Sequence, residues 1–153
     1  MSYSNSIPAA RIDDDERTGR RPERVAMGRL LPVGLAAAAV ALVANALLRL
    51  LARGPLDVSS AFEPLQWGSV IAASVVGVAG ATVVLAVLAR TSSRPIRLFG
   101  IVAAVALLLS LGGPLSARSE PGGSTTAVLV LVAMHVVTAA IAVGFLTTLA
   151  RER

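Results

Sequence analysis

Residues 30–52 read LLPVGLAAAAVALVANALLRLLA, a run in which one amide and one arginine are the only strongly polar side chains. A helix of this length rises by about 35 Å at roughly 1.5 Å per residue, enough to cross a hydrocarbon layer about 30 Å thick. A chain surrounded by lipid must satisfy its backbone hydrogen bonds internally, and a helix does so. The stretch therefore predicts a transmembrane helix, and Gly54-Pro55 directly after it is typical of a helix end.

Three further apolar runs follow, at about residues 67–89, 96–115 and 127–150. The third is the weakest, because Gly112-Gly113-Pro114 follows only sixteen apolar residues and we expect it to interrupt the helix. Such a short span would either thin the bilayer or reach residue 115 through a distorted last turn. The four runs predict an all-α fold, a four-helix transmembrane bundle over residues 29–153.

Residues 1–28 precede the first span and have a different composition. They contain an acidic run at 13–16, a basic run at 17–24 and no apolar periodicity. A segment that buries so little apolar surface cannot offset its loss of conformational entropy. We expect a disordered tail on the cytoplasmic side.

Charge and composition limit the classes of function. The chain is 55% hydrophobic and 15% charged, with a formal net charge of +5 carried by arginines that flank the apolar runs. Arginines at such positions set membrane topology, so we expect no nucleic-acid partner despite the basic balance. The absence of cysteine excludes disulfides, thiolate catalysis and Cys-ligated metals.

The distribution of arginine predicts the orientation. If the amino terminus is cytoplasmic, one side of the membrane holds eleven arginines, at positions 11, 17, 20, 21, 24, 29, 90, 94, 97, 151 and 153. The other side holds three, at 49, 53 and 118. Because cytoplasmic flanks carry the excess of positive charge, we expect a multi-pass protein of the cell membrane with both termini in the cytoplasm.

Strongly polar groups within a span are costly and are therefore candidate functional residues. Asn45 and His135 lie at matching depth, roughly 10–12 Å below the same membrane boundary, so a hydrogen bond between them is an option if their helices are neighbours. Arg49 lies one turn from Asn45 on the same helix face. Glu63, or alternatively Asp57, is the nearest acid that would neutralise it.

Two interpretations of these residues stay open. In the first, Asn45, Arg49, Glu63 and His135 form a polar cluster in the outer leaflet that serves as a binding site. In the second, Asn45 and His135 only join helices, while Arg49 extends to the headgroups. The sequence predicts no metal site and no catalytic residue, because His135 has no second ligand and no nucleophile accompanies it.

Other features favour helix packing. The second span carries a row of small residues, Ala73, Gly77 and Ala81, with Gly80 beside it, and such rows let helices approach closely in lipid. Ala37 and Ala41 extend the Asn45 face of the first span. The hydroxyls at positions 74, 82, 110 and 138 are expected to bond to carbonyls of their own helices.

The chain resembles a family of small four-span membrane proteins of unknown function from GC-rich prokaryotes. The residues that carry this resemblance are Ala44-Asn45-Ala46, the stretch at 61–65 (AFEPL) and Met134-His135, and the similarity covers about residues 29–150. The resemblance implies the four-span architecture and transfers no mechanism.

Three functions are consistent with these features. The first is a non-enzymatic structural or accessory membrane protein, surrounded by the lipid bilayer and associated with a second copy or another membrane protein. The second is a small transporter or channel-like protein that uses the outer polar cluster, although every carboxylate lies outside the spans. The third, an enzyme acting on lipid, is the least favoured, because no paired carboxylate or metal constellation lies in a span. No cofactor is predicted.

Overall fold

The computed structural model describes residues 25–150 of the chain, so residues 1–24 of the tail predicted over 1–28 lie outside the described residues, and its last two residues, Met27 and Gly28, belong to the first helix. The helices are α1 (Met27–Arg53), η2 (Glu63–Leu65), α2 (Trp67–Thr91), α3 (Pro95–Ser110), α4 (Gly112–Ser116), η3 (Ala117–Ser119) and α5 (Thr125–Thr148). Four helical segments of 24 to 27 residues are long and apolar enough to cross a membrane. The all-α, four-span architecture expected from the sequence is confirmed, and the chain is a multi-pass membrane protein.

The third span is longer than the sequence indicated. Leu111 keeps right-handed helical geometry, at φ −67° and ψ −16°, between α3 and α4. Its N–H donates to Leu107 O, and the N–H of Leu115 donates to Leu111 O. Pro114 falls in the first turn of α4, where the missing N–H is tolerated. Gly112-Gly113-Pro114 therefore bends the path without ending it, and the span runs for 25 residues, from Pro95 to Ser119.

α1 packs against both α2 and α5, and α5 also contacts α3. One face of α1 is buried, and it carries mainly small residues: Leu30, Gly34, Ala37, Ala41, Asn45 and Ala52. At Gly34, an added Cβ would lie 2.7 Å from Thr82 Oγ1 of α2. Glycine at this position therefore lets α1 and α2 approach closely, as small residues do in membrane helices.

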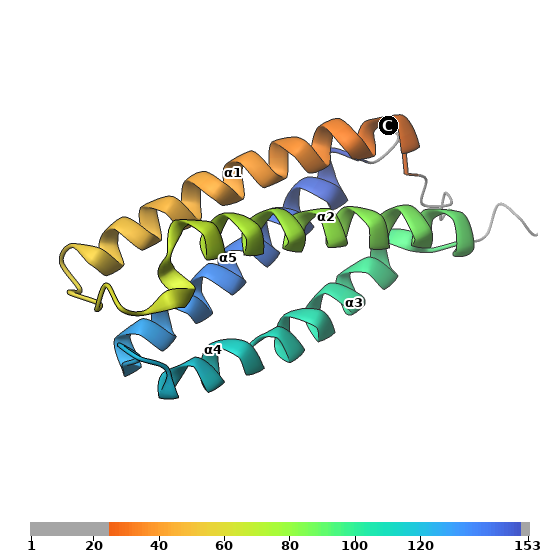
Figure 1. Ribbon diagram of the computed structural model, residues 1–153. Helices are drawn as coiled ribbons and strands as arrows, with labels where there is room; N and C mark the ends of the chain where they lie inside the picture. The colour runs from red at the N-terminus through yellow and green to blue at the C-terminus, as the bar shows by residue number, and fades with distance from the viewer. Residues whose placement is uncertain (1–24, 151–153) are drawn as a thin grey trace, which may run out of the picture.

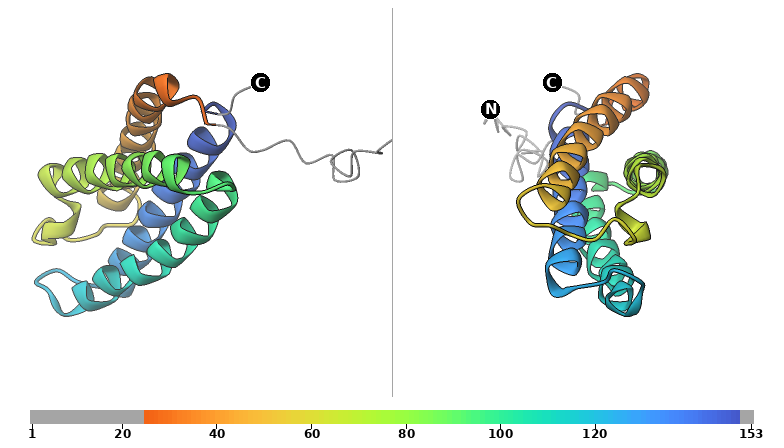
Figure 2. Two further views of the ribbon diagram at one scale, coloured as in Figure 1. Left: turned by 90° about the vertical axis from the view of Figure 1, so that its right-hand side faces the viewer. Right: turned by 60° about the vertical axis from the view of Figure 1, so that its left-hand side comes forward.

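The two ends of the described chain meet at one end of the bundle, named here the terminal end. The N–H of Ala26 donates to the carbonyl of Ala150 at 2.9 Å. Val25, which the sequence placed in the tail, is buried in a cluster that includes Leu85 and Leu146. Figure 2 shows the start of α1 and the end of α5 side by side.

α3 is attached to the bundle mainly through its first turn. Its three buried residues, Pro95, Ile96 and Phe99, all lie there. Figures 1 and 2 show α2 and α3 close together at the turn that joins them, and then diverging toward the opposite end of the bundle. We name that opposite end, which carries the two longer connections, the loop end.

The α1–α2 connection folds over the loop end. Phe62 and Leu65 are fully buried in a cluster with Ala117, Ala127 and other residues of the loop end. The connection also contacts the α4–α5 turn, where Gly122 has a φ of +75°. A Cβ added at Gly122 would lie 3.0 Å from the Phe62 nitrogen, so both conformation and space favour glycine there.

A candidate binding cleft between α2, α3 and α5

A cleft of about 460 Å³ occupies the space between the diverging helices α2 and α3, and α5 forms its back wall. Phe99, buried against the terminal end, lines one limit of the cleft, and Pro64 and Ser69 line the other. The wall is largely apolar. Its polar side chains come from every spanning segment: Asn45, Ser69, Ser74, Ser110, His135 and Thr138.

The small residues predicted to pack helices lie on the wall of this cleft. Ala73, Gly77, Gly80 and Ala81 all line it. A Cβ added at Gly77 would lie 3.6 Å from Thr138 Cγ2, and one added at Gly80 would meet nothing within 4 Å. The row therefore forms part of the cleft wall, whereas the glycine that contacts a side chain across the α1–α2 interface is Gly34.

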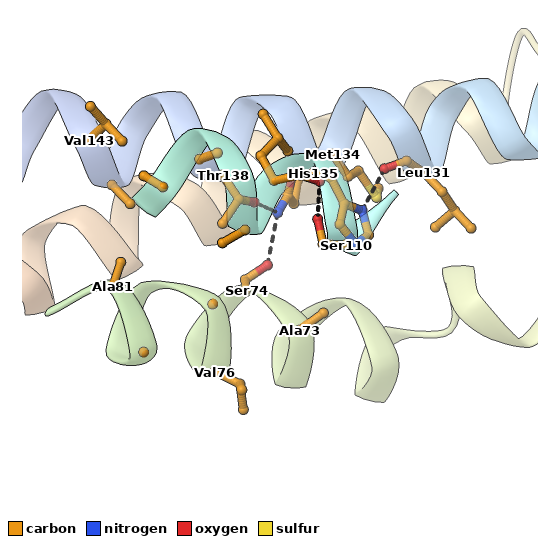
Figure 3. A pocket seen from close by; sticks show the side chains of 18 of the residues that line it. Ala73, Ser74, Val76, Ala81, Ser110, Leu131, Met134, His135, Thr138 and Val143 are labelled. Carbon is orange, nitrogen blue, oxygen red and sulfur yellow. Dashed lines mark hydrogen bonds between the residues drawn. The ribbon is translucent and has the colours of Figure 1, made fainter. Parts of the chain in front are cut away.

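Asn45 lies at the base of the cleft, and only 3% of it is exposed. Its Nδ2 donates to Ser74 Oγ of α2 at 2.9 Å and to Thr138 Oγ1 of α5 at 2.8 Å. Figure 3 shows Ser74 directed from α2 toward α5, where Thr138 lies. Three helices are thus joined through one amide group, and we name Asn45, Ser74 and Thr138 the amide cluster.

The bonding of Ser74 fixes the orientation of this amide. The Ser74 hydroxyl donates its single proton to Val70 O at 2.7 Å. Ser74 Oγ can therefore only accept from Asn45, which requires the NH₂ group on that side. The opposite amide atom, Asn45 Oδ1, is buried and has no hydrogen-bond partner among the described residues.

His135 shares the cleft with Asn45 but does not bond to it. Its Nδ1 lies 2.9 Å from Leu131 O in the preceding turn of α5. A carbonyl oxygen can only accept, so Nδ1 carries a proton and Nε2 is the ring nitrogen without a bond to Leu131. The hydrogen bond predicted between Asn45 and His135 is not formed. Asn45 bonds instead to Thr138, one turn further along α5.

The two other members of the predicted cluster lie at the loop end. Arg49 Nε donates to Leu65 O at 2.8 Å, and its guanidinium carbon lies 4.0 Å from the centroid of the Trp67 ring. Glu63 accepts from Ser69 Oγ at 2.7 Å, so the expected pairing with Arg49 is not formed. The four residues therefore divide into two groups: Asn45 and His135 lie at the cleft, whereas Arg49 lies near the end of α1 and Glu63 in the α1–α2 connection.

Arg53 has a role that the charge pattern did not indicate. Its guanidinium donates to the carbonyls of Val58, Ser59 and Phe62. These bonds, with that of Arg49 to Leu65, hold the α1–α2 connection against the end of α1. Carbonyl acceptors are not visible in a sequence, and the only hint was an arginine directly before a long Gly-Pro loop.

The polar groups available in the cleft are hydroxyls, one amide and one imidazole. Among the described residues that line it there is no Asp, Glu, Lys or Arg. The part of the chain that the structure describes also holds no group of three or more His, Cys, Asp or Glu placed to bind a metal. What the cleft offers is an apolar surface with a few hydrogen-bonding groups at its base.

The fold and the cleft define a four-span membrane protein with a side pocket that opens between two of its helices. Residues 21–152 match the family of unknown function DUF6069, and the chain belongs to this family. No curated protein and no solved structure matches the chain.

Proposed function

We propose that the protein is a non-enzymatic, accessory membrane protein that binds a small amphiphilic molecule, which enters the cleft sideways from the bilayer. The observation that carries this proposal is the cleft itself, with a buried and unpaired amide oxygen at its base. The buried residues of α3 all lie near its start, so the rest of the helix diverges from α2 and leaves an entrance between the two helices.

The size and composition of the cleft support this function. Small-molecule sites commonly measure roughly 300–1,000 Å³ and combine an apolar lining with a few polar groups that orient the ligand. The cleft of about 460 Å³ falls in this range. Its apolar part is formed by side chains such as Val76, Val102 and Leu107, which suit an alkyl or ring system.

A binding role fits the cleft better than catalysis or conduction. The His135 ring bonds to a backbone carbonyl, whereas a general base would be paired with a nucleophile or an orienting carboxylate. Toward the terminal end, Phe99 is packed with Leu85 and Leu146, and this apolar plug separates the cleft from that side of the bundle. Transport through the protein would require the plug to open.

We also propose that the protein resides in the cell membrane with the terminal end facing the cytoplasm. Arg90, Arg94 and Arg97 surround the α2–α3 turn at the terminal end, while Arg53 and Arg118 lie at the loop end. The excess of arginine over the whole chain favours the same orientation. In this orientation the amide cluster lies in the outer half of the membrane.

Photo-crosslinking tests the binding function. The wild-type protein in lipid nanodiscs is mixed with a diazirine-bearing long-chain alcohol, irradiated, and mapped by peptide mass spectrometry. We expect labels to concentrate on the cleft walls formed by α2, α3 and α5. Labels spread evenly over the lipid-facing surfaces of all helices would contradict the proposal.

A matched pair of tryptophan substitutions controls this experiment. Gly80→Trp places a large ring inside the cleft, whereas Gly144→Trp places the same ring on an exposed face of α5. Neither glycine has a neighbouring atom within 4 Å of an added Cβ. We expect cleft labelling to fall about tenfold in Gly80→Trp and to be unchanged in Gly144→Trp.

A further inference from the structure

Building on the proposed binding function, we infer that the cleft selects an uncharged amphiphile with a hydroxyl group, an alcohol or a phenol, whose proton is donated to Asn45 Oδ1. The inference rests on the hydrogen-bonding groups left free at the base of the cleft. The chemistry of the ligand head group follows from them.

The first free group is an acceptor. Asn45 Oδ1 is buried and unpaired, although both Nδ2 protons of the same amide are used. Buried acceptors are nearly always paired in folded proteins, and each exception calls for an explanation. A ligand that brings an O–H or N–H to this oxygen supplies the missing partner.

The second free group is a donor. Thr138 Oγ1 accepts from Asn45, and its own proton has no acceptor among the described residues. A hydroxyl ligand matches this pair, because it donates one proton and accepts another through the same oxygen. An ether, ester or ketone provides only an acceptor and leaves Asn45 Oδ1 unpaired.

His135 adds a second acceptor on the same wall. With Nδ1–H bonded to Leu131 O, Nε2 is an acceptor for a ligand in the cleft whenever the ring carries a single proton. Figure 3 places His135 beside Thr138 on the side of α5 that faces the cleft. A head group with a second hydroxyl would find this acceptor as well.

The residues that line the cleft disfavour ionic head groups. No arginine or lysine lines the described cleft, so a phosphate or carboxylate would be buried without a guanidinium or ammonium partner. The amide cluster lies about 12 Å below the loop end, by the helical rise from Asn45 to Arg53, which is too deep for a charged group to remain in the headgroup layer. The ligand is therefore neutral.

A paired-ligand crosslinking experiment tests the inference. Two probes share one diazirine-bearing alkyl chain, and they differ only in ending as the free alcohol or as its O-methyl ether. With the wild-type protein in nanodiscs we expect the alcohol to label the cleft about tenfold more than the ether. Equal labelling by the two probes overturns the inference and leaves the proposed function standing. Labelling of the cleft by neither probe removes the proposed function as well.

Two variants test the role of the amide. In Asn45→Leu, which removes Oδ1 and keeps the branched shape of the side chain, we expect alcohol labelling to fall to the level of the ether. Thr82→Val removes a threonine hydroxyl that bonds to Val78 O outside the cleft, and we expect it to keep the full preference. If Asn45→Leu keeps the preference, or if Thr82→Val loses it, the inference is wrong. The wild-type comparison of the two probes decides the question even if Asn45→Leu does not fold.

Competition identifies the source of the hydroxyl. Unlabelled diacylglycerol represents a membrane lipid with a free hydroxyl, and an unlabelled fatty alcohol represents a free single-chain ligand. Displacement of the probe by either one, but not by triacylglycerol, supports the inference and names the source. Failure of both to displace the probe overturns it.

Discussion

Asn45 has two roles that predict different responses to substitution. It joins α1, α2 and α5 through Nδ2, and its Oδ1 is buried and unpaired at the base of the cleft. Hydrogen bonds between membrane helices contribute only about 0.6 kcal/mol each. An unpaired buried acceptor costs about 1–3 kcal/mol. The net contribution of this amide to stability is therefore small.

We accordingly predict that Asn45→Leu changes the free energy of unfolding by less than about 1 kcal/mol, because the two lost bonds are offset by removal of the unpaired oxygen. Unfolding in mixed micelles by titration with a denaturing detergent measures this change. A loss above about 2 kcal/mol would show that the amide acts mainly as a helix tie.

The residue scale also shows where sequence reasoning ended. Asn45 was identified because an amide inside an apolar span has a cost, and its depth correctly indicated a partner on the fourth span. The partner is Thr138, one turn from the predicted His135, because the relative rotation of two helices is not encoded in depth. Arg49 donates to the carbonyl of Leu65 and lies over the Trp67 ring. Neither partner is an acidic residue, so pairing by opposite charge did not predict them.

At the scale of elements, the contact between α1 and α2 depends on the shape of Gly34. We predict that Gly34→Ala destabilises the protein by about 1–3 kcal/mol, since the new methyl group overlaps Thr82 Oγ1 and forces the helices apart. Unfolding of the purified variant in micelles measures the loss.

A second substitution provides the control for this contact. The double variant Gly34→Ala, Thr82→Ala removes the overlapping atoms, and we expect it to recover most of the lost stability. Gly144→Ala, where an added Cβ meets nothing within 4 Å, should leave stability unchanged. If the double variant is no better than Gly34→Ala alone, the overlap is not the cause.

The α1–α2 connection depends on Arg53. We predict that Arg53→Met increases hydrogen exchange at the Val58 and Phe62 amides about tenfold, because hydrogen bonds from a charged donor contribute about 1.5–3 kcal/mol. Exchange followed by mass spectrometry reports this change. Arg118→Met, at an exposed arginine of the other loop-end connection, should leave the exchange at these two amides unaltered.

Element boundaries were predictable for three spans and not for the third. Hydropathy located the spans to within about three residues, because lipid exposure requires long apolar helices. Gly112-Gly113-Pro114 was expected to interrupt the third span, which would then reach at most residue 115, yet the helical path continues to Ser119. The same Gly-Gly-Pro sequence is compatible with a proline that follows the end of one helix and with a proline in the first turn of the next. The right-handed helical backbone of Leu111 shows that the second case applies here.

For the whole molecule, the absence of cysteine makes the orientation easy to test. We predict that a membrane-impermeant thiol reagent labels Ser119→Cys, at the loop end, in intact cells. It should label Ser93→Cys, in the α2–α3 turn, only after the membrane is permeabilised. Both serines are exposed in the structure, so accessibility within the protein does not limit the reaction. The reverse pattern would place the terminal end outside the cell.

The contact between the beginning and the end of the described chain affects how the protein is made. α1 packs extensively against α5, and Ala26 is hydrogen-bonded to Ala150. α1 is synthesised before α5, so these contacts form only after α5 has been made. Until α5 is made, the part of the α1 surface that packs against α5 faces lipid or the insertion machinery, and Asn45 has only its α2 partner, Ser74. Nascent chains that stop before α5 should therefore be recognised and degraded by membrane quality control, whereas the completed polypeptide escapes.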